Sequence, residues 1–260
     1  MVICKSLDEI QKMRAANGLV ADVLTNLKEL VRPGVTTKYL DEVAEKKIRD
    51  SGAVPAFKGY HGYPATLCAS INDAVVHGIT SKEELKEGDI VSLDVGVVMD
   101  GYYGDSAVTI GVGEISDSAD LLLRITRESL ERAIGSVKVG GYVSDLGYAV
   151  QSYVEKHGFS VVREFVGHGI GTNLHEDPQI PNYGKPGYGT VLQSGMVLAI
   201  EPMVNIGKPE VQVLDDGWTA VTMDGGLSAH FEHSVAVLEE GPVVLSLPTE
   251  DKFSVETRAS

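Results

Sequence analysis

The feature that most constrains this chain is a pattern of apolar residues and glycines that recurs after 106 residues. Similarity at a fixed offset indicates duplicated structural units. No Ser/Pro-rich linker separates the two copies, so we expect a single domain over residues 1–260, built from halves of about 6–111 and 112–248 that share one core. The positions that match at this shift are Val31, Gly34, Leu40, Val43, Ile48 and Gly52 with Val137, Gly140, Leu146, Ala149, Val154 and Gly158.

Each half contains helices followed by strands. Ser6 and Glu9 have the spacing of a capping box and predict the start of a first helix, and a second apolar helical face begins at Thr36 or Thr37 and ends at Gly52. Helices in blocks followed by hairpins indicate an α+β fold with antiparallel sheet. The segments expected to be strands are 90–98, 103–111, 196–205, 218–222 and 229–238, and the one expected to be a surface loop is 177–189.

Two aspartates are expected to converge on one hairpin. Asp100-Gly101 between apolar strands favours a two-residue type I′ turn. This turn pairs Asp94 with Ala107 and Asp105 with Gly96, which makes the two aspartates diagonal neighbours on one face, about 7–8 Å apart. Like charges this close repel unless a cation lies between them. Two solvated aspartates at a sheet edge remain the alternative.

Three further polar residues interrupt segments that otherwise indicate burial. Glu201 and Glu232 lie within apolar strands, and His168 is flanked by glycines that allow unusual backbone angles and close approach. Taken singly, each glutamate could form a salt bridge and the histidine could be structural. With Asp94 and Asp105 they make four carboxylates and one imidazole, too many anions for one buried place without about two divalent cations. This donor set suits Mn, Fe, Co or Zn, and such a pair of ions supports hydrolysis.

Around these residues the chain resembles the type I methionine aminopeptidases of bacteria, over nearly its whole length. The resemblance implies the pita-bread fold, a pseudo-twofold α+β architecture. The stretches that carry it are Lys58–Pro64, Asn72–Gly78, Leu93-Asp94-Val95, Gly101–Ser106, Gly167–Gly171, Ile200-Glu201-Pro202, Asp216–Thr219 and Phe231-Glu232-His233.

The resemblance implies a role for each predicted ligand. Asp94 would bind one of two divalent ions with both carboxylate oxygens, and Asp105 and Glu232 would bridge it to the other. His168 and Glu201 would complete the shell of the second ion. Glu201 would also move protons between the attacking water and the leaving amine.

The resemblance also implies substrate-binding residues. His175 would hydrogen-bond the scissile peptide, and His77 would orient or stabilise the tetrahedral intermediate. On the residues alone, structural roles for both histidines stay open. Leu174 stands where many relatives have an aromatic residue, so the shape of the pocket rim is open too. The residues that would line a pocket for an N-terminal Met side chain, with ordinary packing as the alternative, are Tyr60, Tyr63, Cys68 and Trp218.

The composition excludes some classes of partner. There are 22 Lys and Arg against 37 Asp and Glu, and the net charge of −15 disfavours general binding to nucleic acid or a membrane surface. Only Cys4 and Cys68 are present, so no disulfide framework is expected. We find no signal-peptide pattern and no apolar stretch long enough to span a bilayer. These features predict a cytoplasmic protein.

The resemblance implies removal of the initiator Met from nascent proteins whose second residue is small. It also implies a monomer, with transient ribosome contact left open. A proline-directed aminopeptidase or prolidase of the same fold is an alternative, disfavoured because the repeat begins at Ser6 and leaves no room for the extra N-terminal domain expected of those enzymes. A non-enzymatic binding scaffold is a second alternative, disfavoured because all the predicted ligands are retained.

Overall fold

The computed structural model describes residues 2–248, and the two predicted N-terminal helices are confirmed. Helix α1 (Leu7–Leu30) begins after Ser6, whose side chain accepts from the Glu9 N–H in a complete capping box. Helix α2 (Thr37–Asp50) begins after Thr36, whose hydroxyl accepts from Tyr39 N–H. Helix α3 spans Asp117–Gly135, and α4 spans Val143–Lys156. Helices α2 and α4 are both 14 residues long and begin 106 residues apart.

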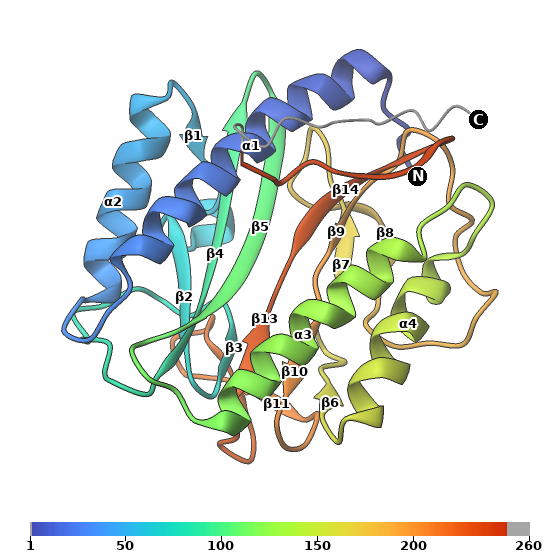
Figure 1. Ribbon diagram of the computed structural model, residues 1–260. Coiled ribbons are helices and arrows are strands. Elements are labelled where there is room, and N and C mark those ends of the chain that lie inside the picture. The colour runs from blue at the N-terminus through green and yellow to red at the C-terminus, as the bar shows by residue number, and fades with distance from the viewer. Residues whose placement is uncertain (1, 249–260) are drawn as a thin grey trace, which may run out of the picture.

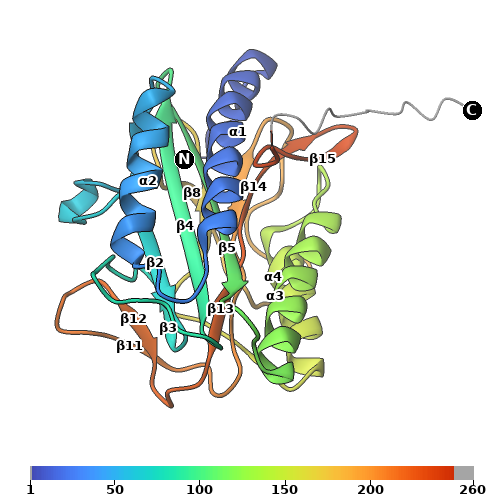
Figure 2. The ribbon, with the colours of Figure 1, turned by 60° about the vertical axis from the view of Figure 1, so that its left-hand side comes forward.

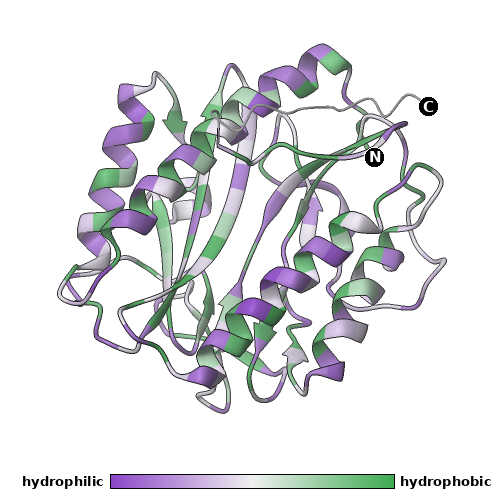
Figure 3. Ribbon diagram, viewed as in Figure 1, coloured by the Kyte–Doolittle hydropathy of each residue, from purple (hydrophilic) through white to green (hydrophobic). Residues whose placement is uncertain are grey.

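The helices flank the strands in two pairs. Figure 1 shows α2 on the left, α1 running diagonally from the left to the top, and α3 and α4 on the right, with the strands between and behind the two pairs. In the turned view of Figure 2, α3 and α4 stand together on the right, across β5 from α2. The helices carry hydrophilic and hydrophobic stripes, while most strands are hydrophobic (Figure 3). Each pair buries its apolar stripe mainly against strands of its own half, and a further core cluster, which includes Ile10, Phe57 and Ile170, contains residues of both halves.

The first half contains β1 (Val54–Pro55), β2 (Leu67–Ile71), β3 (Ala74–Val76), β4 (Ile90–Met99) and β5 (Tyr102–Gly111), with the short helix η1 (Tyr60–Gly62). The predicted hairpin register is confirmed, because Asp94 pairs with Ala107 and Gly96 with Asp105. Asp100 and Gly101 have φ angles of 51° and 79°, the two positive values that a type I′ turn requires. Both aspartates therefore face the same side of the β4–β5 ribbon.

The strands of the second half are shorter and more often interrupted than the sequence predicts. Its strands, all paired antiparallel, are β6 (Ser160–Val161), β7 (Gly167–Gly169), β8 (Glu176–Ile180), β9 (Val197–Ile200), β10 (Met203–Asn205), β11 (Val211–Val213), β12 (Ala220–Thr222), β13 (Ser228–His230), β14 (His233–Leu238) and β15 (Gly241–Val244).

Four predicted segments in this half are wrong in part. The strand expected over 196–205 is interrupted at Glu201-Pro202, and the one over 229–238 at Phe231-Glu232. The strand expected from Trp218 begins only at Ala220. The segment 177–189 is not wholly a loop, because its first residues belong to β8, which pairs with β7. The six residues between β7 and β8 carry no two-residue turn signal, so the sequence did not reveal this pairing.

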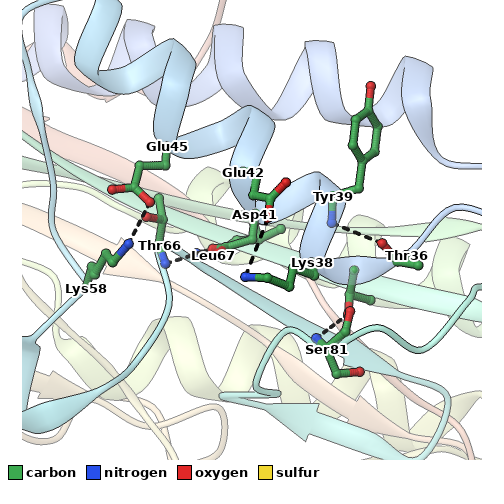
Figure 4. Close-up of polar contacts among 11 residues, drawn as sticks. Thr36, Lys38, Tyr39, Asp41, Glu42, Glu45, Lys58, Thr66, Leu67 and Ser81 are labelled. Atoms are coloured by element: carbon green, nitrogen blue, oxygen red, sulfur yellow. Dashed lines mark hydrogen bonds and ion pairs between the residues drawn. The ribbon is translucent and has the colours of Figure 1, made fainter.

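Buried polar contacts fix α2 to the start of β2. Asp41, 6% exposed, accepts hydrogen bonds from the backbone N–H groups of Thr66 at 2.8 Å and Leu67 at 2.9 Å (Figure 4). The Thr37 hydroxyl and Ser81 backbone make a second link. These bonds fix the start of β2, which pairs with β4. Across residues 2–248, no helix has the length and apolar content needed to cross a bilayer.

Candidate metal centre and substrate pocket

The five predicted metal ligands meet in one cavity between the two halves. Its volume is about 170 Å³. Each ligand comes from a different strand or strand junction: Asp94 from β4, Asp105 from β5, His168 from β7, Glu201 from the β9–β10 junction and Glu232 from the β13–β14 junction.

The strand breaks explain how the two glutamates reach this cavity. Glu201 follows the last residue of β9, and Pro202, which has no N–H, comes next. At the other break, Glu232 N–H donates to the Ala107 carbonyl at 2.9 Å, and the Ser106 hydroxyl donates to the Glu232 carbonyl at 2.6 Å. The second half is thereby bonded directly to the hairpin that carries Asp105.

His168 is oriented by a backbone bond. Its Nδ1 lies 2.9 Å from the Gly169 carbonyl, which only accepts, so Nδ1 carries the proton and Nε2 offers a lone pair. Nε2 is 4.0 Å from Asp105 Oδ2 and 3.6 Å from Glu201 Oε1. The predicted unusual backbone angles are wrong, because His168 lies in strand β7 and neither flanking glycine has a positive φ. The flanking glycines instead let neighbouring backbones approach closely, because a side chain on Gly167 would collide with the Ala199 carbonyl.

Three carboxylates of the site have oxygens without a hydrogen-bond partner among the described residues. Asp94 Oδ1, Asp105 Oδ1 and Glu232 Oε1 are buried and make no hydrogen bond among the described residues. One ligand atom each from Asp105, His168 and Glu232 lie within 4.8 Å of one another. Burial raises the pKa of Asp94 to about 7, and burial followed by the Asp94 charge raises that of Asp105 well above its ordinary value. Buried carboxylates with unused oxygens beside an imidazole lone pair fit a divalent cation.

The two remaining predicted histidines border the same cavity. His77 directly follows β3 with a φ of 59°, which is uncommon for a residue with a side chain, and its ring centroid lies 6.5 Å from that of Trp218. His175 Nδ1 is 2.8 Å from the Tyr60 hydroxyl, and its ring centroid is 4.4 Å from that of His168. Burial lowers the pKa of His77, and burial with the nearby His168 lowers that of His175 to about 4.

The predicted pocket residues form the other wall. Cys68 pairs with Asp94 across β2 and β4, which places this wall beside the metal ligands. The rings of Tyr63 and Trp218 meet edge to face with centroids 5.1 Å apart. The structure thus brings together every site residue predicted from the sequence, and Leu174 lines the cavity with them.

Sequence reasoning missed two residues near the site. Phe57 lines the cavity, and its ring lies where a side chain on Gly96 would be. His230 is buried with Nε2 only 3.4 Å from Glu201 Oε2. The sequence signal for Phe57 was weak, because the contact of its ring with Gly96 becomes apparent only once the fold is known. His230 belongs to the Ala229–Val237 stretch that drew attention to Glu232, so its position beside a candidate ligand was a usable signal.

A family model, metallopeptidase family M24, matches residues 11–239. The chain belongs to metallopeptidase family M24. It is 53% identical over 247 residues to a methionine aminopeptidase of Clostridium perfringens, covering 95% of this chain and 99% of that protein. It is 50% identical over 246 residues to methionine aminopeptidase 1 of Bacillus subtilis, covering 95% and 99%. The predicted resemblance is confirmed.

Two solved structures confirm the pita-bread fold. A methionine aminopeptidase from Rickettsia prowazekii superposes with a TM-score of 0.94 at 41% identity, covering 95% of this chain and all of that one. A prolidase from Pyrococcus horikoshii gives a TM-score of 0.76 at 23% identity, and this chain covers 66% of it. The second likeness concerns the fold alone.

Proposed function

We propose that this M24 protein is a methionyl aminopeptidase that removes the initiator Met from nascent proteins when the second residue is small. The observation that carries the proposal is the convergence of the predicted ligands and pocket residues on one cavity. The methionine aminopeptidases identical to it at about half of their positions support the substrate. We further propose that residues 1–260 form one catalytic domain of two related halves.

The proposed cofactor is a pair of divalent ions. Asp94 would hold one ion with both oxygens, Asp105 and Glu232 would bridge the pair, and His168 and Glu201 would hold the other. Mn, Fe, Co and Zn all suit these donors. When bound, such a pair lowers the pKa of a shared water and polarises the scissile carbonyl.

The chain's own side chains would then handle the protons and the substrate. Glu201, held through its backbone carbonyl by the Asn182 amide at 2.9 Å, would take the proton of the attacking water and return one to the leaving amine. If Tyr60 donates to Nδ1 of His175, the Nε2–H of His175 is left to bind the scissile peptide. His77 would help stabilise the tetrahedral intermediate.

The pocket wall suits a thioether. Tyr60, Tyr63 and Trp218 offer aromatic edges and faces to a sulfur atom, and Cys68 fills the wall beside Asp94. Burial raises the pKa of the Cys68 thiol well above its ordinary value, which argues for a wall residue and against a nucleophile. A Met side chain bound here would place its own amide bond next to the ligands.

The substrate determines the proposed setting. Initiator Met is exposed on chains that are emerging from the ribosome, so we propose a cytoplasmic monomer that makes transient contact with the ribosome. Gel filtration with light scattering would test the monomer, with a mass of twice 27.8 kDa as the contradicting result.

The substrate assignment is tested with three peptides and Mn²⁺-loaded protein. We expect release of Met from Met-Ala-Ser, little release from Met-Leu-Ser and none of Ala from Ala-Pro-Ser. Preferential cleavage of Ala-Pro-Ser would favour the proline-directed alternative. Cleavage of none of the three, in protein with confirmed metal content, would favour the binding scaffold.

A further inference from the structure

His230 lies next to the carboxylate of Glu201, and it has no role in the proposed reaction. Its side chain is 1% exposed, and Nε2 makes no hydrogen bond among the described residues. An unpaired buried nitrogen costs stability, so native structures rarely keep one without a reason. This nitrogen faces the carboxylate of Glu201, whose Oε2 is 3.4 Å away.

The two oxygens of Glu201 face different histidines. Oε1 lies 3.6 Å from His168 Nε2, on the side of the metal ligands, while Oε2 faces His230. The backbone of His230 is fixed at its end of β13: its N–H donates to the Thr109 hydroxyl at 2.8 Å, and the same hydroxyl donates to its carbonyl at 2.8 Å. It also pairs with Met203 of β10. The imidazole is thus held at a constant place behind the carboxylate.

We propose that His230 is a positioning residue for Glu201: its Nε2–H donates to Oε2 and keeps Oε1 turned toward the metal ligands. This inference rests on the proposed function, because it deepens the role of Glu201 in it. The separation of 3.4 Å is longer than a formed N–H···O bond. Catalytic hydrogen bonds are often long in an empty site and shorten when the site is filled.

The contact acts on the chemical step and leaves substrate binding alone. A carboxylate that takes a proton from water must present one oxygen at a fixed angle, and rotation about its last bond would lose that angle. The residues of the Met pocket come from η1, β2 and the segment before β12, whereas His230 is on β13. Loss of the His230 donor is therefore expected to lower kcat and leave KM nearly unchanged.

Two variants of similar side-chain size distinguish the effect of the hydrogen-bond donor from the effect of the side-chain volume. The amide nitrogen of His230→Gln is the same number of bonds from Cα as Nε2, so it can donate to the same oxygen. His230→Met fills similar space without a donor. We expect kcat for Met-Ala-Ser to fall about 10- to 100-fold in His230→Met, the range for a hydrogen bond to a charged group. We expect His230→Gln to recover most of this loss.

The matched control is His233→Gln, because His233 flanks Glu232 from the other side but bonds to Ser246, with Nδ1 2.8 Å from its hydroxyl. It should keep a kcat near wild type. Metal content under saturating Mn²⁺ should be the same in all three variants. An unchanged kcat in His230→Met would overturn the inference. Equal loss of one ion in both His230 variants would also overturn it, since it would make His230 a ligand.

A crystal structure of the Mn²⁺-loaded protein gives a readout that does not depend on turnover. We expect the Nε2–Oε2 distance between His230 and Glu201 to shorten to about 3.0 Å or less. A distance that stays at 3.4 Å or lengthens would overturn the inference even if the variants do not fold. If the wild-type protein releases no Met from any peptide, the proposed function fails, and this distance still decides whether His230 orients Glu201.

Discussion

Lys5 forms an ion pair with Glu176. We expect removal of the Lys5 charge to lower the free energy of unfolding more than removal of any other single charge. Lys5 Nζ lies 2.6 Å from Glu176 Oε2, and the two side chains are 3% and 5% exposed. The other carboxylate oxygen accepts from Asn173 N–H at 3.1 Å. Glu176 begins β8 and directly follows His175, so this pair anchors the loop that carries a proposed catalytic group.

Lys5→Met keeps the length of the aliphatic stem and removes the charge. The Glu176 carboxylate is then buried with one backbone hydrogen bond and no cation. Breaking a buried pair in this way costs about 3–5 kcal/mol, whereas an exposed pair is worth about 0–1 kcal/mol. We expect a loss of about 3 kcal/mol or more in the free energy of unfolding, because the pair is almost fully buried.

The chain offers a matched control in Lys58 and Glu45. Their atoms are 2.7 Å apart, nearly the same distance, but the side chains are 42% and 23% exposed. Lys58→Met should therefore cost less than about 1 kcal/mol. The double variant Lys5→Met with Glu176→Gln should recover much of the lost stability, since the buried charge is gone.

Urea unfolding at pH 7, followed by far-UV circular dichroism, measures all four proteins under one condition. A loss in Lys5→Met no larger than that in Lys58→Met would refute the reasoning from burial. No recovery in the double variant would refute the assignment of the loss to an unpaired carboxylate.

Four further results are expected. Gly104→Ala should destabilise by about 1–3 kcal/mol in urea unfolding, because its new methyl would lie 2.8 Å from the α1 backbone at Ala16 and Asn17. Asn17→Ala, a separate variant, should lower the free energy of unfolding by about 1–3 kcal/mol in the same assay, because the Asn17 amide oxygen accepts from the buried Asp105 N–H. Glu201→Gln should lower kcat by about two orders of magnitude in peptide assays, and near wild-type turnover would contradict its proposed role. Chelation should abolish Met release and lower Tm, with both restored by Mn²⁺, because ions that bind only the folded state stabilise it.

Local chemistry made part of the fold readable from the sequence. The capping residues of α1 and the Asp100-Gly101 turn act within a few residues, so the helix start and the hairpin register were predicted correctly. The register then placed Asp94 and Asp105 on one face by the alternation of strand side chains. Glu201 and Glu232 stood out because carboxylates inside apolar segments need partners.

Most of the missed features depend on contacts between distant segments, and one is a local pairing without a turn signal. The pairing of β8 with β7 could not be read from a stretch rich in Pro and Gly. Glu232 bonds to Ala107 of the first half, and the Phe231 N–H donates to the Pro202 carbonyl at the other break, so neither break was visible in its own segment alone. Phe57 became a site residue only through packing between segments that the sequence did not indicate. The position of His230 two residues before Glu232 was a usable signal, but its contact with Glu201 depends on the fold.

The central claim is that four carboxylates and one imidazole gather in this cavity because cations neutralise them. Anomalous diffraction from a crystal of Mn²⁺-loaded protein tests it most directly. We expect two peaks about 3.5–4 Å apart, with Asp105 and Glu232 between them. An active protein that shows no Mn²⁺ peak at these residues would contradict the account.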